Sequence, residues 1–164
     1  MKHHLALAFA LALSAAAPAI AQEFKAGDIT IDKAWSRATP KGAEVGAGYL
    51  TIHNNGAAPD RLTGGTTDFG NVEVHEMSMV GGVMKMRELK DGLAIPAHGT
   101  VTLAPGGSHL MFTGLKQPLI KGAVAKATLT FEHAGAIAVE FAVGGVGAAN
   151  PAGGAKGDMN GMKM

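Results

Sequence analysis

The chain has 164 residues and no cysteine, and its 14 Lys and Arg residues nearly balance 13 Asp and Glu residues. Without cysteine, a disulfide framework and any metal site that depends on a thiolate are excluded. The balanced charge offers no basic patch of the kind that binds nucleic acid or an anionic membrane surface, so neither is an expected partner.

Residues 1–21 have the pattern of a secretory signal peptide. Lys2 precedes an apolar run over residues 5–13, and the segment ends in Ala19-Ile20-Ala21, a cleavage site of the A-x-A type. This run is shorter than the about 20 residues that span a bilayer, so we expect an exported protein with no membrane insertion of the mature form. Cleavage before Gln22 leaves 143 residues, enough for one domain.

Residues 22–146 are rich in short β-like segments separated by turn residues. No apolar period of 3.6 residues lasts longer than a couple of turns there, so no helix is predicted. Many short strands at this spacing predict a single all-β domain, a sandwich or a barrel. The predicted strands cover residues 29–31, 48–53, 60–63, 71–80, 83–89, 100–103, 109–112, 125–132 and 137–143.

Only Gly81-Gly82 separates two of these strands, which predicts a tight two-residue hairpin with a primed turn. If Val80 lies opposite Val83, antiparallel pairing fixes the register of the whole hairpin. One face then carries the pairs Met79 with Met84, Met77 with Met86, and His75 with Glu88, and the other carries Glu76 with Arg87 and Ser78 with Lys85. The charged face is expected to be solvated, which leaves the face with histidine and methionine for another purpose.

A second histidine and methionine follow the turn at Gly106-Gly107. His109 and Met111 are two residues apart in a predicted strand and therefore share a face. Together with the hairpin they predict one cluster of imidazole nitrogens and thioether sulfurs. Such ligands, without a thiolate, favour Cu(I).

Core packing is the competing interpretation, because methionine commonly fills gaps in protein cores. The methionines alone would favour it. Two histidines in the same stripe favour a metal instead, since a buried polar group without a partner costs about 1–3 kcal/mol. One ion would serve both imidazoles.

Residues 147–164 change composition to Gly, Ala, Asn and Lys, which predicts a disordered tail. The tail contains Met159, Met162 and Met164. Two interpretations stay open: these sulfurs bind a second copper ion, or they are incidental to a low-complexity segment.

Several segments make the chain resemble the periplasmic copper chaperones of the PCuAC type. The hallmark of that family is a His, ten residues, a Met, about 21 residues and then His-x-Met. It falls here on His75, Met86, His109 and Met111, with 22 residues in the second gap. The matching segments are AWSRATP at 34–40, GYLTIHNNG at 48–56, DRL at 60–62, VEVHEM at 72–77, GVMKMR at 82–87, IP at 95–96, LAPGGSHLM at 103–111 and LTFEHAG at 129–135.

The resemblance implies a cupredoxin-like antiparallel β-sandwich that binds Cu(I) through those four residues. It implies a periplasmic metallochaperone that carries copper toward the copper site in subunit II of cytochrome c oxidase, often alongside a Sco-type thiol protein. We expect a monomer with no catalytic site and no other cofactor. The alternatives are a periplasmic copper-storage or resistance protein and a copper-dependent redox protein.

Other function classes fit the residues less well. Methionine does not suit the hard metals of hydrolases, and two thioethers favour Cu(I) over the Cu(II) that oxidase turnover would require. A domain used only for adhesion has no need of this cluster. Met77, Met79 and Met84 are interpreted as an apolar shield around the ion, and His53, His98 and His133 as exposed turn residues.

Overall fold

The computed structural model describes residues 22–151, and its regular elements there are all strands, which confirms the all-β prediction. Within that part no helix is long and apolar enough to cross a membrane. The predicted signal peptide and the tail methionines lie outside the described residues. The strands are β1 Phe24–Ala26, β2 Ile29–Arg37, β3 Val45–Asn54, β4 Asp60–Thr67, β5 Asn71–Val80, β6 Val83–Glu88, β7 Leu93–Ile95, β8 Thr100–Leu103, β9 His109–Thr113, β10 Val124–Phe131 and β11 Gly135–Gly144.

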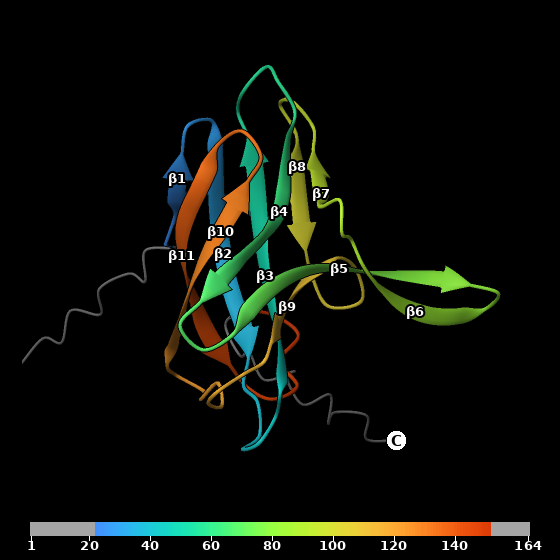
Figure 1. Cartoon of the computed structure of the whole chain (residues 1–164), viewed down its shortest axis with the longest axis vertical. Coiled ribbons are helices and arrows are strands. Elements are labelled where there is room, and N and C mark those ends of the chain that lie inside the picture. Colours follow the sequence, from blue (N-terminus) through green and yellow to red (C-terminus); the bar gives the residue numbers. More distant parts are fainter. Residues whose placement is uncertain (1–21, 152–164) are drawn as a thin grey trace, which may run out of the picture.

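Seven strands pair in a closed ring, in the order β2, β11, β10, β4, β5, β9, β3 and back to β2. The ring wraps one core as a cupredoxin-like β-sandwich, as the sequence predicted (Figure 1). The pairing of β11 with β2 is parallel, and the neighbouring pairings are antiparallel. The remaining strands extend the ring at its margins: β1 on β2, β8 on β3, β7 on β4 and β6 on β5.

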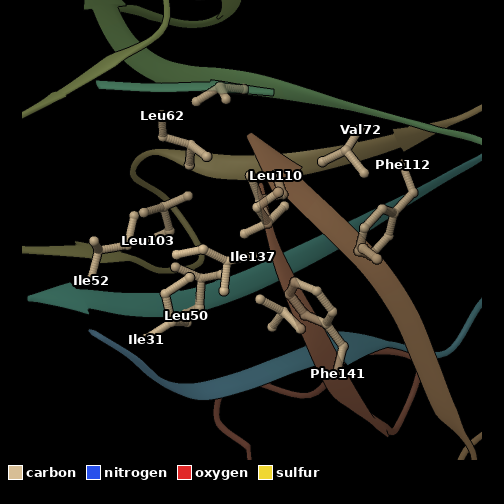
Figure 2. Close-up of a cluster of buried hydrophobic side chains, with 14 of the residues drawn as sticks. Ile31, Leu50, Ile52, Leu62, Val72, Leu103, Leu110, Phe112, Ile137 and Phe141 are labelled. Atoms are coloured by element: carbon tan, nitrogen blue, oxygen red, sulfur yellow. The ribbon is translucent and has the colours of Figure 1, made fainter. Parts of the chain in front are cut away.

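Inward-facing residues of the ring form a continuous hydrophobic core. In β10 and β11 every second side chain is buried, including Leu129, Phe131 and Phe141. Phe112 of β9 lies edge-on against Phe141, with ring centroids 5.5 Å apart (Figure 2). Gly48 permits this packing, because a Cβ atom there would lie 2.8 Å from the Phe112 ring. The core therefore fixes the positions of β5 and β9, whose opposite faces stay outside it.

Two details of the sequence prediction are wrong. The strand predicted over residues 60–63 is longer, because β4 runs through Gly64 and Gly65 to Thr67. A Cβ atom at residue 65 would lie 2.4 Å from the carbonyl oxygen of Thr128, so glycine allows close strand approach there. His53 is not an exposed turn residue: it lies half-buried in β3, within the strand predicted over residues 48–53, and its Nδ1 is 3.0 Å from Thr100 Oγ1. His98 and His133 are exposed turn residues, as predicted.

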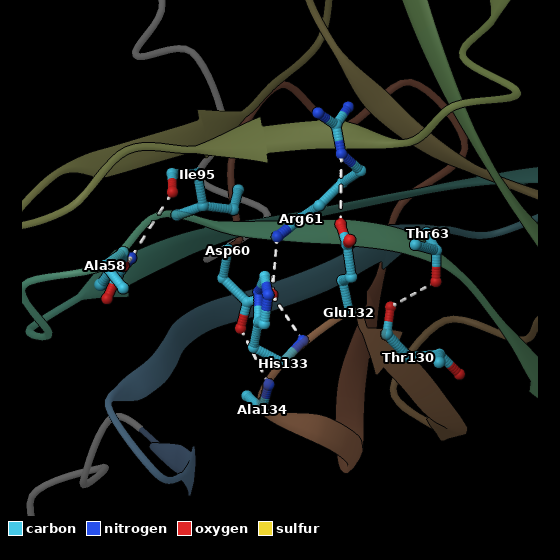
Figure 3. Close-up of polar contacts among 10 residues, drawn as sticks. Ala58, Asp60, Arg61, Thr63, Ile95, Thr130, Glu132, His133 and Ala134 are labelled. Atoms are coloured by element: carbon cyan, nitrogen blue, oxygen red, sulfur yellow. Dashed lines mark hydrogen bonds and ion pairs between the residues drawn. The ribbon is translucent and has the colours of Figure 1, made fainter.

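Asp60 forms a polar corner that joins the start of β4 to the turn between β10 and β11 (Figure 3). Its Oδ1 accepts hydrogen bonds from the backbone N–H groups of Arg61, at 2.7 Å, and His133, at 2.9 Å. Its Oδ2 accepts one from the N–H of Ala134 at 2.9 Å. Burial by itself would raise the pKa of Asp60, but these backbone donors together outweigh it and lower the pKa. The carboxylate stays ionised and clamps two distant segments.

Candidate metal centre

The hairpin of β5 and β6 has the predicted turn and register. Gly81 and Gly82 both have positive φ, 59° and 79°, as a type I′ turn requires. Cα partners are His75 with Glu88, Met77 with Met86, Met79 with Met84, and Val80 with Val83. Strand β6 pairs only with β5, and the hairpin projects beyond the body of the sandwich (Figure 1). The observed pairs are those predicted from the sequence, so histidine and methionine share one face of the hairpin.

Strand β9 brings the second histidine beside the first. His75 and His109 are direct Cα partners of the β5–β9 pairing, and their ring centroids lie 5.8 Å apart. Val74 and Leu110, the next pair along, point into the core and are buried. The two imidazoles therefore lie together on the face of β5 and β9 that is opposite the core.

The hydrogen bonds of His109 determine which of its nitrogens is free. Its Nδ1 lies 3.1 Å from the carbonyl oxygen of Gly107. A carbonyl oxygen only accepts, so Nδ1 carries the proton and donates it. In the neutral ring this leaves the lone pair on Nε2 available to a metal.

His75 has the complementary arrangement. Its Nε2 lies 2.9 Å from Oε2 of Glu73, so Nε2 carries the proton and Nδ1 carries the lone pair. That Nδ1 atom is buried and has no hydrogen-bond partner. A carboxylate that receives the second N–H of an imidazole is the usual support of a metal-binding histidine. The unpartnered nitrogen fits a metal ligand.

Glu73 is a candidate site residue that the sequence patterns did not single out. Its Oε2 accepts a hydrogen bond from Nε2–H of His75, and its Oε1 accepts one from Thr113 Oγ1 at 3.1 Å. Glu73 pairs with Met111 across β5 and β9, so it shares the face of the two histidines. The spacing Glu-Val-His in β5 was the available signal, because residues two apart in a strand share a face.

The predicted sulfur ligands differ in exposure. Met111 is half-buried beside Glu73, whereas Met86 of β6 is 51% exposed. The side chain of His75 is only 12% exposed, and His109 as a residue 7%. The two imidazoles are thus packed against the sandwich, while half of the Met86 residue surface is open to solvent.

Harder metal sites are not formed in the part of the chain that the structure describes. Among residues 22–151 no group of three or more His, Asp or Glu side chains is placed to hold an ion. The methionine sulfurs of the same face are available to complete a site at His75 and His109. A site with sulfur ligands differs from zinc sites of hydrolases, which use nitrogen and oxygen.

A closed β-sandwich with two imidazoles on its outer face and methionines on a projecting hairpin defines a class of small cupredoxin-like domains. The chain belongs to a family within that class, because residues 29–143 match the family described as "Putative lipoprotein LpqE-like". A putative lipoprotein, Lxx21020 of Leifsonia xyli subsp. xyli, is 36% identical over 108 residues. That match covers 65% of this chain and 64% of the length of the relative.

Solved structures give the same assignment. The copper-bound PCuAC domain from PmoF2 is 32% identical with a TM-score of 0.62, and the match covers 74% of this chain and 97% of that domain. The apo PmoF2 PCuAC domain is 28% identical with a TM-score of 0.66, and the match covers 79% of this chain and 99% of that domain. Cu(I)-DR1885 from Deinococcus radiodurans is 29% identical with a TM-score of 0.54, and the match covers 77% of this chain and 82% of that chain. The resemblance to PCuAC proteins is confirmed.

Proposed function

We propose that this chain is an exported metallochaperone that carries Cu(I) as its cargo. The ligands in this proposal are Nδ1 of His75, Nε2 of His109 and the sulfur atoms of Met86 and Met111. The observation that carries the proposal is the buried Nδ1 of His75, which has no partner and lies beside a second imidazole with a free nitrogen. The likeness to a copper-bound PCuAC domain supports the same metal.

The chemistry of the four ligands favours carriage over catalysis. All four are neutral when they bind, and the two polarisable sulfurs favour Cu(I) over harder ions. The carboxylate of Glu73 lies against His75 and offsets the charge of the ion. Because Met86 is half-exposed, a ligand from an acceptor protein can replace its sulfur without entry into the sandwich.

The place and destination of the protein complete the proposal. The pattern of residues 1–21 and the lipoprotein names of the family and its relative support export to the periplasm. The PCuAC likeness supports a monomeric domain that delivers copper to subunit II of cytochrome c oxidase, alongside a Sco-type thiol protein. No catalytic residue is part of this function.

A competition titration under anaerobic conditions tests the metal and its ligands. The full mature chain should withdraw Cu(I) from a chromophoric chelator and should bind Zn(II) far more weakly. His109→Ala should weaken Cu(I) binding, whereas the matched control His53→Ala should leave it unchanged, because His53 lies on β3 beside Thr100. Equal affinity for Zn(II), or equal effects of the two substitutions, would contradict the proposed ligand set.

Delivery needs a separate experiment. The Cu(I)-loaded chain is mixed with the copper-free soluble domain of oxidase subunit II, with and without a Sco-type protein, and the copper in each component is measured after separation. Transfer to the oxidase domain supports the proposed destination. Tight Cu(I) binding without transfer in either mixture would leave a carrier or storage protein and reject the oxidase as its acceptor.

A further inference from the structure

Three methionines of the hairpin remain after the four ligands are assigned: Met77, Met79 and Met84. Their interpretation as an apolar shield is wrong for Met79 and Met84, which are 64% and 46% exposed. Every residue of β6 is exposed, so these side chains shield nothing in the part of the chain that the structure describes. Such exposure is costly for apolar side chains, which calls for another role.

The register places the three sulfurs together. Met79 lies directly opposite Met84, and Met77 lies two residues further in on the same face. Opposite Cβ atoms in an antiparallel pair are about 4.5–5.5 Å apart, and diagonal neighbours about 7–8 Å, within reach of long side chains. The three thioethers can therefore meet at one point above the hairpin.

Charged side chains occupy the other face of the hairpin. Arg87 donates a hydrogen bond to Glu76 there, at 2.9 Å, and Lys85 lies opposite Ser78. The alternation keeps these cations away from the sulfur face. The charged face is thus solvated, while the opposite face, outward from His75 and Glu88, carries only the methionine pairs.

We propose that Met77, Met79 and Met84 form a second Cu(I) position that consists of thioethers alone. This inference rests on the proposed function and extends it. Soft thioethers without a thiolate select Cu(I), and they bind it without losing a proton. Without an imidazole, this outer position holds the ion more weakly than the histidine site.

The two positions are adjacent, since Met86 of the histidine site lies directly opposite Met77. Cu(I) moves inward by ligand exchange: a bond from copper to an outer sulfur breaks as a bond to Met86 or to an imidazole nitrogen forms. The ion stays Cu(I), so no electron is transferred. The outer position thus receives copper before it reaches the histidines and holds it again on release.

Methionine methyl NMR during an anaerobic Cu(I) titration tests the proposal. The full mature chain carries Met159→Leu, Met162→Leu and Met164→Leu, so that tail sulfurs cannot take part. The first equivalent of Cu(I) should shift the methyl signals of Met86 and Met111. The second equivalent should shift those of Met77, Met79 and Met84.

Two variants in that background locate the second ion. Met79→Leu with Met84→Leu conserves volume at exposed positions, so the fold is retained. This variant should lose the second equivalent and keep the first with unchanged affinity. Adding Val80→Met and Val83→Met restores the number of sulfur atoms, but on the opposite face. That matched control should not recover the second ion.

The outcomes separate the two proposals. If the first equivalent leaves the signals of Met86 and Met111 unshifted, the proposed function is wrong. If the first ion binds as expected but the second leaves Met77, Met79 and Met84 unshifted, the outer position does not exist. Retention of the second ion by the double leucine variant, or its recovery by the control, would also overturn the outer position.

Discussion

Asp60 and His75 each place buried polar side-chain atoms on a strand of the sandwich, and they differ in whether those atoms have hydrogen-bond partners. Both oxygen atoms of Asp60 accept hydrogen bonds from backbone N–H groups. Nδ1 of His75 has no partner. A buried polar group that serves the fold is normally satisfied within the chain. The contrast fits a structural role for Asp60 and the proposed role of His75 as a metal ligand.

Asp60→Ala should give the largest effect, on stability. The substitution leaves the part-buried N–H groups of Arg61, His133 and Ala134 without their acceptor, and a hydrogen bond to a charged group contributes about 1.5–3 kcal/mol, part of which water can replace at these positions. We expect a loss of about 3–5 kcal/mol in the free energy of urea unfolding. Cu(I) affinity of the folded protein should not change. If Asp60→Ala kept its stability but bound Cu(I) more weakly, Asp60 would belong to the metal site and its structural role would be wrong.

His75→Ala should give the next effect, on the metal alone. Loss of an imidazole ligand should weaken Cu(I) binding by about 100-fold or more, which corresponds to about 2.7 kcal/mol. The matched control His53→Ala, on β3 beside Thr100, should leave the affinity unchanged. Equal Cu(I) affinity of His75→Ala and the parent chain in the chelator competition would exclude His75 as a ligand.

Glu73→Gln tests the site at His75 without removing a proposed ligand. Glu73 accepts a hydrogen bond from His75 and is not itself proposed to bind the ion. The loss of the carboxylate charge beside Nε2 of His75 should weaken Cu(I) affinity by about tenfold. Glu76→Gln is the matched control, three residues further along β5 on the opposite face. The same chelator competition measures both, and an equal effect would show that only overall charge matters.

The smallest expected effect is on the pH dependence of stability, compared between the parent chain and Asp60→Asn. Because hydrogen bonds lower the pKa of Asp60 in the folded protein, the carboxylate contributes stability above its unfolded pKa of about 4. That contribution is lost as pH falls through the lower, folded pKa. Asp60→Asn should therefore make urea unfolding less dependent on pH below about pH 4. An unchanged dependence would assign acid sensitivity to other carboxylates.

The hairpin and its ligand face were predictable from the sequence because they depend on local rules. Gly81-Gly82 fixes the turn, the turn fixes the register, and a period of two fixes the faces. The strand after Gly106-Gly107 predicted His109 and Met111 as part of the same candidate cluster, and the family spacing falls on the same residues. These parts of the prediction required no knowledge of distant contacts.

The features that the sequence did not reveal depend on long-range pairing. Glu73 contacts His75 within β5, but its place beside Met111 and its hydrogen bond from Thr113 depend on the pairing of β5 with β9. Gly64-Gly65 looks like a turn until β10 is placed against it, where close backbone approach requires glycine. Strands β1 and β7 have three residues each and carry too little pattern to be recognised alone.

Because β6 pairs with β5 alone, the hairpin can open faster than the sandwich unfolds. One edge of this strand faces solvent, whereas β5 continues into the closed ring at its other end. Segments with few buried contacts open with a smaller free energy than the whole domain. The tip of the hairpin can therefore separate and re-form many times within the lifetime of one folded molecule, while the imidazoles remain in the ring. If copper binds as proposed, its residence time should follow this local opening of the hairpin and not the unfolding of the whole sandwich.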